Sequence, residues 1–359
     1  MKKLIAVLAI VCLISGVAFA QIGGTVFGGV NLVENDGDNT TASGAMSRLR
    51  FDGSGEAENG KYGGYIRANA FATEVPQGTL TGKPWEGNAL TLLDVWGYAW
   101  WKPVDQFMLR IGSNGGDNFW GKEGVAAWGF YQVAGDVGVA NAGNAWGGGY
   151  GENVTRGAFF GGFDNGLMME IKPIDILAIN IGVPFAANGS EVADFYQASA
   201  LQIDVNLDFG NIALTMNGLN DKGKLFVFFG LGAVENLNLA VGFGYDLGTE
   251  VAEIGLAAKY GFSDSFALKF RLAAALVEKD TQIIADIMPI IGINETMTAF
   301  VSAGIAMTND AKDMDFHFNP YIQIGEEWGP SFWAGFKLSS TGNMDKFVWS
   351  IPIAINFAF

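Results

Sequence analysis

The sequence has 359 residues, of which half are apolar, 51 are glycine, one is cysteine and one is histidine. Its formal net charge of −16 argues against nucleic acid as a partner, because a phosphate-binding protein needs a basic surface. Cys12 is the only cysteine, which excludes a disulfide within the chain and a cysteine metal cluster.

The first twenty residues, MKKLIAVLAIVCLISGVAFA, predict a secretory signal peptide that is cleaved before Gln21. Lys2 and Lys3 form the charged start, residues 4–14 form the apolar core, and residues 18–20 form a small-x-small cleavage site. A retained membrane anchor is the alternative, but the apolar run is short for a span. We expect residues 21–359 to form a single domain, with a net charge of −18 once the two lysines are removed from −16.

Apolar and polar residues alternate over many segments of about ten residues. In "ALQIDVNLDFG" (200–210), for example, Leu201 and Ile203 alternate with Gln202 and Asp204. The same period of two recurs in "ILAINIGV" (176–183), "SFALKFRL" (265–272), "DFHFNPYIQI" (315–324) and the final "FVWSIPIAINFAF" (347–359). Beyond residue 20 no apolar run is long enough for a transmembrane helix, whereas ten alternating residues match a tilted membrane-spanning strand.

The connections between these segments are of two kinds. Tight turns such as "KPVDQ" (102–106), "FSDSF" (262–266) and "INET" (293–296) contrast with longer polar stretches such as "NLVENDGDNTTASG" (31–44). Short turns at one end and long loops at the other are typical of an outer-membrane barrel. The pattern predicts an all-β fold, a transmembrane antiparallel up-and-down β-barrel of 16–18 strands.

A soluble β-sandwich is the alternative fold, because it also produces alternating strands. Its core would have to hold Asp204, Asp208, Lys269 and Arg271, and buried unpaired charge is costly. A barrel with lipid outside and water inside accommodates both faces, and its closure leaves no unpaired strand edge in lipid. Aromatic residues near strand ends fit a girdle at the membrane interface: Trp100, Trp101, Phe262, Phe266, Trp328 and Phe332.

The alternation that ends in Phe357 and Phe359 resembles the terminal strand of bacterial outer-membrane β-barrels. In that family this strand carries the sorting signal that the barrel-assembly machinery reads. The resemblance implies that the protein is exported to the outer membrane and contacts its lipid.

A long irregular segment, about 114–164, separates "QFMLRIGS" (106–113) from "GLMMEIKPI" (166–174). It is rich in glycine and aromatic residues rather than in charge and proline, so we expect it to be ordered. It follows the fifth expected strand. The placement resembles the general diffusion porins, whose loop after the fifth strand folds into the barrel and narrows it.

Charged residues before and within this segment suggest a pore constriction. Alternation places four arginines on one face of expected strands two, three and five: Arg48, Arg50, Arg67 and Arg110. The loop supplies four acids: Asp117, Glu123, Asp136 and Glu152. The porin resemblance implies a basic wall facing an acidic loop, and charged rings underlie pore selectivity. The alternative is that these arginines simply pair with strand carboxylates such as Asp52 and Asp94.

Other candidate sites are weaker. Trp120, Trp128 and Trp146 offer apolar faces on which sugar rings can stack, although packing of the loop against the wall is the simpler role. His317 is the only histidine, and with no cysteine beyond residue 20 neither a metal site nor a catalytic triad is readily built from it. We therefore expect no enzyme activity, no cofactor and no metal.

The sequence favours a porin whose water-filled channel passes small hydrophilic solutes and ions by passive diffusion. A surface adhesin or structural barrel, or a substrate-specific channel of the sugar type, are the alternatives. Porins commonly form homotrimers, which the resemblance makes possible here.

Overall fold

The computed structural model describes residues 21–35, 37–41, 45–74, 89–113, 165–184, 199–218, 223–232, 234–277, 280–308, 312–326 and 330–358. All its regular elements are β-strands. Within these ranges there is no helix long and apolar enough to cross a membrane.

Twenty strand segments follow one another along the chain. They are β1 (Gln21–Asn35), β2 (Thr40–Thr41), β3 (Ala45–Glu56), β4 (Tyr62–Glu74), β5 (Ala89–Val104), β6 (Phe107–Ser113), β7 (Asn165–Ile174), β8 (Leu177–Pro184), β9 (Ala200–Leu207) and β10 (Gly210–Asn217). The others are β11 (Lys224–Leu231), β12 (Leu237–Asp246), β13 (Val251–Ser263), β14 (Phe266–Val277), β15 (Asp280–Asn294), β16 (Met297–Thr308), β17 (Asp313–Gly325), β18 (Ser331–Gly335), β19 (Lys337–Thr341) and β20 (Lys346–Ala358).

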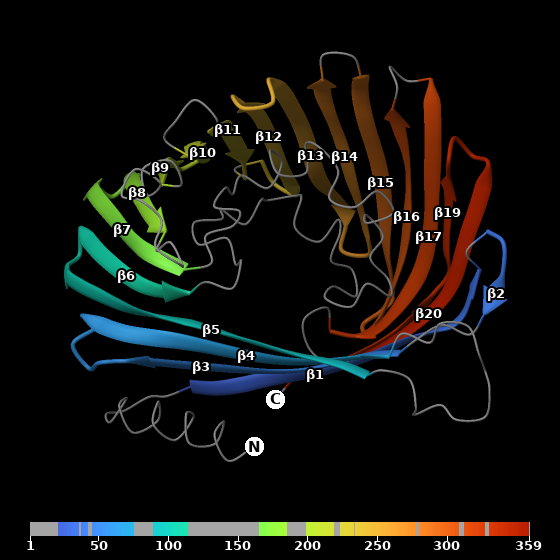
Figure 1. Ribbon diagram of the computed structural model, residues 1–359, viewed down its shortest axis with the longest axis horizontal. Coiled ribbons are helices and arrows are strands. Elements are labelled where there is room, and N and C mark those ends of the chain that lie inside the picture. The colour runs from blue at the N-terminus through green and yellow to red at the C-terminus, as the bar shows by residue number, and fades with distance from the viewer. Residues whose placement is uncertain are drawn as a thin grey trace.

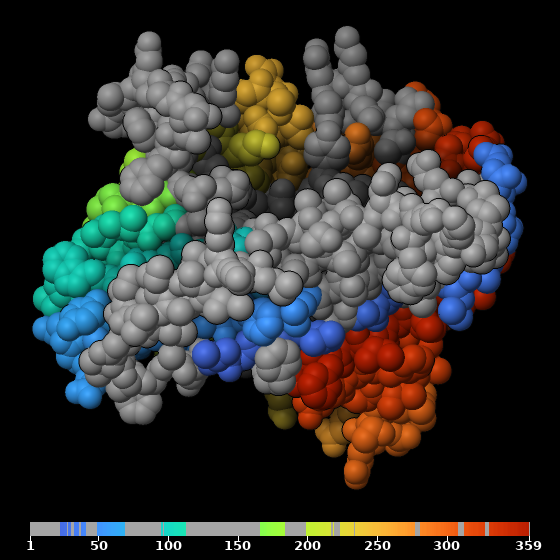
Figure 2. Space-filling model, turned by 60° about the horizontal axis from the view of Figure 1, so that its bottom comes forward, coloured from blue at the N-terminus to red at the C-terminus, as the bar shows by residue number. Residues whose placement is uncertain are grey.

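These segments form one closed antiparallel barrel of eighteen strands. The two-residue β2 only extends an edge of β1, and β18 and β19 are one strand interrupted at Phe336, since both pair with β17 and with β20. Neighbours in sequence are neighbours in space, and β20 pairs with β1 to close the ring (Figure 1). Figure 2 shows the first and last strands, blue and red, side by side. The predicted fold class is confirmed, at eighteen rather than sixteen strands.

The predicted tight turns lie together at one end of the barrel, the short-turn rim. The connections there include 105–106, 175–176, 208–209, 264–265 and 295–296. Turn chemistry explains them: at 294–296, the backbone N–H of Thr296 donates to Asn294 Oδ1 at 3.0 Å, and Asn236 adopts the left-handed region with φ 61°. Residues 75–88, 114–164 and 185–198, which connect strands at the other end, lie outside the described residues.

The alternation predicted from the sequence is confirmed in every quoted segment. Leu272 and Phe318 are exposed on the outer face, whereas Arg271 and His317 are buried on the inner face. The outer face is apolar along most strands, as lipid requires. The expectation that inward-facing polar residues lie in water was wrong for Asp204. Its side chain points inward but is buried, and it accepts hydrogen bonds from Asn180 Nδ2 and Gln202 Nε2, both at 2.9 Å.

The aromatic girdle is present at the short-turn rim, with one correction. Trp101, Phe262, Phe266 and Phe332 are exposed on the outer face, and the Phe262 and Phe266 rings stack with centroids 5.2 Å apart. Trp100 pairs in register with the inward-facing Arg110, so it faces the interior. Neighbouring strand residues point to opposite faces, which means that Trp100 and Trp101 cannot both face lipid. Trp328 lies outside the described residues.

The two faces of β1 provide a direct test of the fold. Val26 is 45% exposed on the outer face and pairs with Leu49, while Thr25 faces inward and pairs with Arg50. We predict that Val26→Glu lowers the free energy of unfolding by up to about 2 kcal/mol, since acidic residues in lipid cost less than the about 2–4 kcal/mol of arginine. Thr25→Glu, which sets a carboxylate opposite Arg50, has no such cost. Urea unfolding in lipid vesicles measures both, and equal losses would contradict the assigned faces.

Candidate functional site

The inner wall of β3, β4 and β6 carries three of the four arginines that the sequence predicted. Arg50 lies on β3, Arg67 on β4 and Arg110 on β6, which are the second, third and fifth strands of the barrel. The residues on either side of Arg50, Leu49 and Phe51, are exposed on the outer face. Arg48 lies on β3 in register with Phe71. We call Arg50, Asp52, Arg67 and Arg110 the arginine wall.

One carboxylate bridges two of these arginines. Asp52 lies opposite Arg67 in the β3–β4 register, and its oxygens accept from Arg50 Nε and Arg67 Nε, each at 2.6 Å. The Tyr65 hydroxyl also donates to Asp52. The pairing alternative is therefore right for Arg50 and Arg67. The four residues of the wall have a formal charge of +2, and Glu170 on the neighbouring β7 acts on Arg110 with the opposite charge.

Two tyrosines hold guanidinium groups against this wall. The Arg67 guanidinium lies 5.5 Å from the Tyr65 ring centroid, and that of Arg110 lies 5.2 Å from the Tyr98 centroid. The two rings are 5.7 Å apart, so the contacts form one continuous row across β4, β5 and β6. Cation–π attraction restrains both arginines to the inner surface. The sequence analysis identified neither tyrosine. Tyr98 contacts Arg110 across two strands, which requires the register, whereas Tyr65 lies two positions before Arg67 on β4, so alternation would have placed both on one face.

A second charged cluster, the buried network, lies roughly half-way round the barrel in the strand order, on β14 to β17. Arg271 Nε donates to Asp286 Oδ2 at 2.7 Å, and its second nitrogen contacts the same oxygen. Ser302 Oγ lies 3.1 Å from His317 Nε2. Gly304 lies in register between Asp286 and His317, and an added Cβ there would overlap the Asp286 carboxylate and reach within 2.7 Å of the His317 ring. Glycine at 304 lets the two side chains approach.

The buried network contains serine, histidine and aspartate but lacks the geometry of a catalytic triad. In a triad, serine and aspartate contact different nitrogens of the imidazole. Here Ser302 Oγ and Asp286 Oδ1 both approach Nε2, at 3.1 and 3.7 Å. The side chains of His317 and Asp286 are also fully buried.

An aromatic cluster also lies on the inner wall of β15 to β18. The rings of Phe300 and Tyr321 stack with centroids 4.8 Å apart, and Trp333 lies 5.8 Å from Tyr321. The Tyr321 hydroxyl donates to Met288 Sδ at 3.6 Å. All four side chains are buried, which indicates that they pack the wall rather than present a face to solutes.

Solvent exposure distinguishes the two charged walls. Side-chain exposure is 25% for Arg50 and Asp52 and 15% for Arg67, but 1% for Arg271 and none for Asp286. Charge in contact with water acts on ions in solution, whereas a sealed, neutralised pair acts on them only weakly. The arginine wall is therefore the candidate functional site.

Several predicted site residues fall outside the described residues. They are Asp117, Glu123, Asp136 and Glu152 of the expected constriction, Trp120, Trp128 and Trp146 of the possible stacking surface, and the terminal Phe359. Phe357 lies on the outer face of β20, exposed, in register with Val26 of β1. In the part of the chain that the structure describes, no group of three His, Cys, Asp or Glu residues could hold a metal ion.

No protein-family model matches the sequence, and no curated protein matches it. Solved porins share the fold. OccAB4 of Acinetobacter baumannii aligns with a TM-score of 0.58 at 12% identity, covering 96% of this chain and 99% of that one. OpdK of Pseudomonas aeruginosa, solved with vanillate, gives 0.57 at 9% identity, with 94% and 98% covered. A mutant porin of Rh. blastica gives 0.50 at 12% identity, with 94% and 100% covered.

These similarities define the class of the fold. At such low identities they establish the architecture of the chain but do not identify a substrate. Together with the closed ring of eighteen strands, they show that the chain has the barrel fold of the porins.

The buried network generates a stability prediction. Asp286→Asn leaves the buried Arg271 without its carboxylate, so we expect a loss of about 3–5 kcal/mol in the free energy of unfolding. The double variant Arg271→Met/Asp286→Leu removes both charges and should lose less. Asp38→Asn is the matched control, because its pair with Lys346 at 2.5 Å is exposed and such pairs contribute at most about 1 kcal/mol. Equal losses for Asp286→Asn and Asp38→Asn, measured by urea unfolding, would contradict the assignment.

Proposed function

We propose that the protein is a porin of the bacterial outer membrane, forming a water-filled channel for passive diffusion of small hydrophilic solutes and ions. The observation that carries the proposal is the arginine wall. It keeps charged side chains in contact with water on the inside of a barrel whose outside is apolar. A barrel that only displayed loops would not need an accessible charged interior. No chemistry is assigned to the protein, and it acts without a cofactor.

Export and assembly belong to the same proposal. Residues 1–20 act as a cleaved signal peptide, and the terminal strand is recognised by the barrel-assembly machinery. The outer faces, including Phe357, contact outer-membrane lipid. A homotrimer is the oligomeric state that the resemblance to general porins suggests.

The long segment 114–164 completes the channel in this proposal by folding inward opposite the arginine wall. Its acids, Asp117, Glu123, Asp136 and Glu152, then face a wall of opposite charge. A narrow gap between charged walls focuses the electric field, so that single charges control which ions pass.

A substrate-specific channel is the second candidate. An aromatic carboxylate is bound by a positive charge that lies beside the face of an aromatic ring. The arginine wall offers two such arrangements, Arg67 with Tyr65 and Arg110 with Tyr98. OpdK, solved with vanillate, has the same fold. Block of the ion current by micromolar benzoate, absent with acetate, would favour this candidate over general diffusion.

Channel recording tests the proposal through ion selectivity. In planar bilayers with a salt gradient, Asp52→Asn should shift the reversal potential toward anion selectivity, and Arg67→Gln or Arg110→Ala toward cation selectivity. Both shifts should shrink at about 1 M salt, where the screening length falls to about 3 Å. Lys346→Gln, whose side chain lies at the opposite rim from the short turns, is the control and should leave selectivity unchanged.

Deleting residues 136–152 tests the inward loop separately. Removal of an obstruction should raise the single-channel conductance while the arginine wall remains. Unchanged conductance would place the loop outside the pore. If the wild-type barrel passes no discrete current steps at all, the protein is better described as a surface-displaying adhesin or structural barrel.

The terminal strand generates an assembly prediction. Deletion of 357–359 removes only the last pairs between β20 and β1, Val26 with Phe357 and Thr25 with Ala358. We expect the truncated protein to refold in detergent with normal heat-modifiable migration, yet to be largely absent from outer membranes. Deletion of the loop residues 136–152 is the control for chain shortening. Normal membrane levels of the truncated protein would show that these residues carry no assembly signal.

A further inference from the structure

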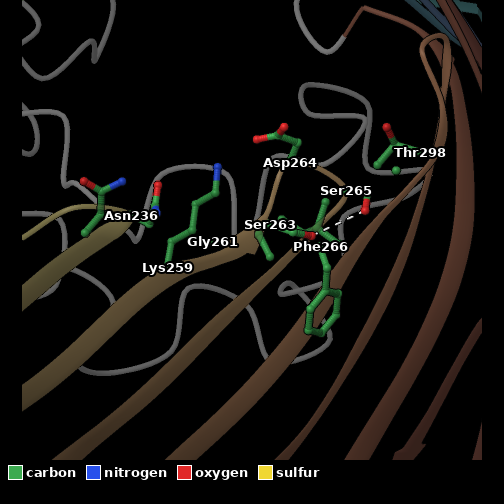
Figure 3. A pocket seen from close by; sticks show the side chains of 12 residues that line it. Asn236, Lys259, Gly261, Ser263, Asp264, Ser265, Phe266 and Thr298 are labelled. Carbon is green, nitrogen blue, oxygen red and sulfur yellow. Dashed lines mark hydrogen bonds between the residues drawn. The ribbon is translucent and has the colours of Figure 1, made fainter.

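A hollow of about 390 Å³ opens on the inner wall at the short-turn rim, between β12 and β16 (Figure 3). Its polar lining includes Asn236, Asn238, Lys259 and Thr298. Figure 3 shows Lys259 rising from β13 beside Asn236, whereas Phe266 points away from this group. The hollow is of the size that holds a small ligand.

Small residues create this hollow. Between Lys259 and the short turns, the inward-facing positions are Gly261 on β13, Ala267 on β14 and Gly292 on β15. A Cβ added at Gly261 would meet nothing closer than the Asn236 side chain at 3.6 Å, which is an ordinary contact. Backbone packing therefore does not require glycine at 261, and the space there is available to a ligand.

The hollow is lined by one cationic side chain, that of Lys259 on β13. Among the described residues, Lys259 forms no ion pair with a carboxylate. Asp264, at the exposed turn tip, is the single carboxylate that lines the hollow.

Neutral hydrogen-bonding groups surround the lysine. Asn236 and Asn238 can donate from their amides and Thr298 from its hydroxyl, and Ser263 and Ser265 lie together with their hydroxyl oxygens 3.4 Å apart. An ammonium group with amide and hydroxyl donors matches an ion that carries several acceptor oxygens.

We propose that this hollow binds a small oxyanion, phosphate or carboxylate, at the short-turn end of the barrel. Lys259 supplies the charge, and the asparagine and threonine side chains supply the hydrogen bonds. Asp264 weakens the affinity by repulsion, which keeps the ion exchangeable. The site is distinct from the arginine wall, and binding at it does not depend on the barrel being a conducting channel.

The test uses the full-length protein in detergent micelles, with its lysines ¹³C-dimethylated, a modification that keeps their charge. Inorganic phosphate and acetate are titrated separately at constant ionic strength while the lysine resonances are followed. Lys259→Arg identifies the Lys259 signal, and Lys102→Arg identifies a control signal from the same rim, where Lys102 pairs with the exposed Asp105 at 3.2 Å. We expect a saturable shift at Lys259 and none at Lys102.

Binding constants of two variants sharpen the test. These constants are measured from the backbone amide resonance of Thr298, which is still observable when Lys259 is replaced. Lys259→Gln should weaken binding by roughly tenfold or more, as loss of a charged hydrogen bond requires. Asp264→Asn should strengthen it by up to about fivefold, the range of an exposed charge interaction. Stronger saturation by phosphate than by acetate identifies a phosphate site, and the reverse identifies a carboxylate site.

Two results would overturn the proposal. One is a Lys259 signal that does not saturate with either ion. The other is an equal shift at Lys102, which would reflect general ion condensation on the rim. Because no current is recorded, failure of the channel proposal leaves this result unaffected, and loss of oxyanion binding leaves the channel proposal standing.

Discussion

The structure depends on one requirement, that every strand finds a hydrogen-bonding partner on both edges. Hydrocarbon offers no partner to an unpaired backbone group, so an open sheet cannot cross a membrane. The pairing of β1 with β20 meets this requirement from Thr25 to Asn31 and again at Glu34 and Asn35, with a register shift between them. Once the ring is closed, the period of two fixes each side chain on the lipid or the inner face. Everything that the protein can do chemically is then confined to the inner face and the rims.

Register decides which inner charges on different strands meet. Asp52 is opposite Arg67, and Arg271 is opposite Asp286, so each of these two arginines finds a carboxylate on the neighbouring strand. Lys259 is instead opposite Lys269. The same rule of alternation and pairing thus places opposite charges in register at two positions and like charges at a third.

The fold was largely predictable from the sequence because alternation is a local property. In runs such as 201–207 and 266–272, the alternation of residue types by itself assigns each side chain to one face of the strand. In turns such as 294–296, the asparagine that stabilises the turn lies within the turn sequence. The site was only partly predictable. Alternation placed Arg50, Arg67 and Arg110 inward. The Tyr98 partner of Arg110 follows only from register, whereas Tyr65, two positions before Arg67 on β4, was open to the same alternation rule and was missed. Asp286 and Ser302 were missed for the same reason: they meet His317 only across strands. Asp204 was placed on the correct face and wrongly expected to lie in water.

Burial makes the interior asymmetric. From β14 to β18 the inner wall is packed with the buried network and with the stacked rings of Phe300 and Tyr321. Across the barrel, Arg50 and Arg67 remain in contact with water. An ion inside the barrel therefore experiences the field of the arginine wall, whereas the Arg271–Asp286 pair acts on it only as a distant, neutral dipole. The overall acidity of the chain is then a poor guide to selectivity, because what counts is the charge that borders water. On the described inner wall, that charge includes the arginines of β3 and β4 with Asp52 between them, and Lys259 near Asp264 next to the short-turn rim.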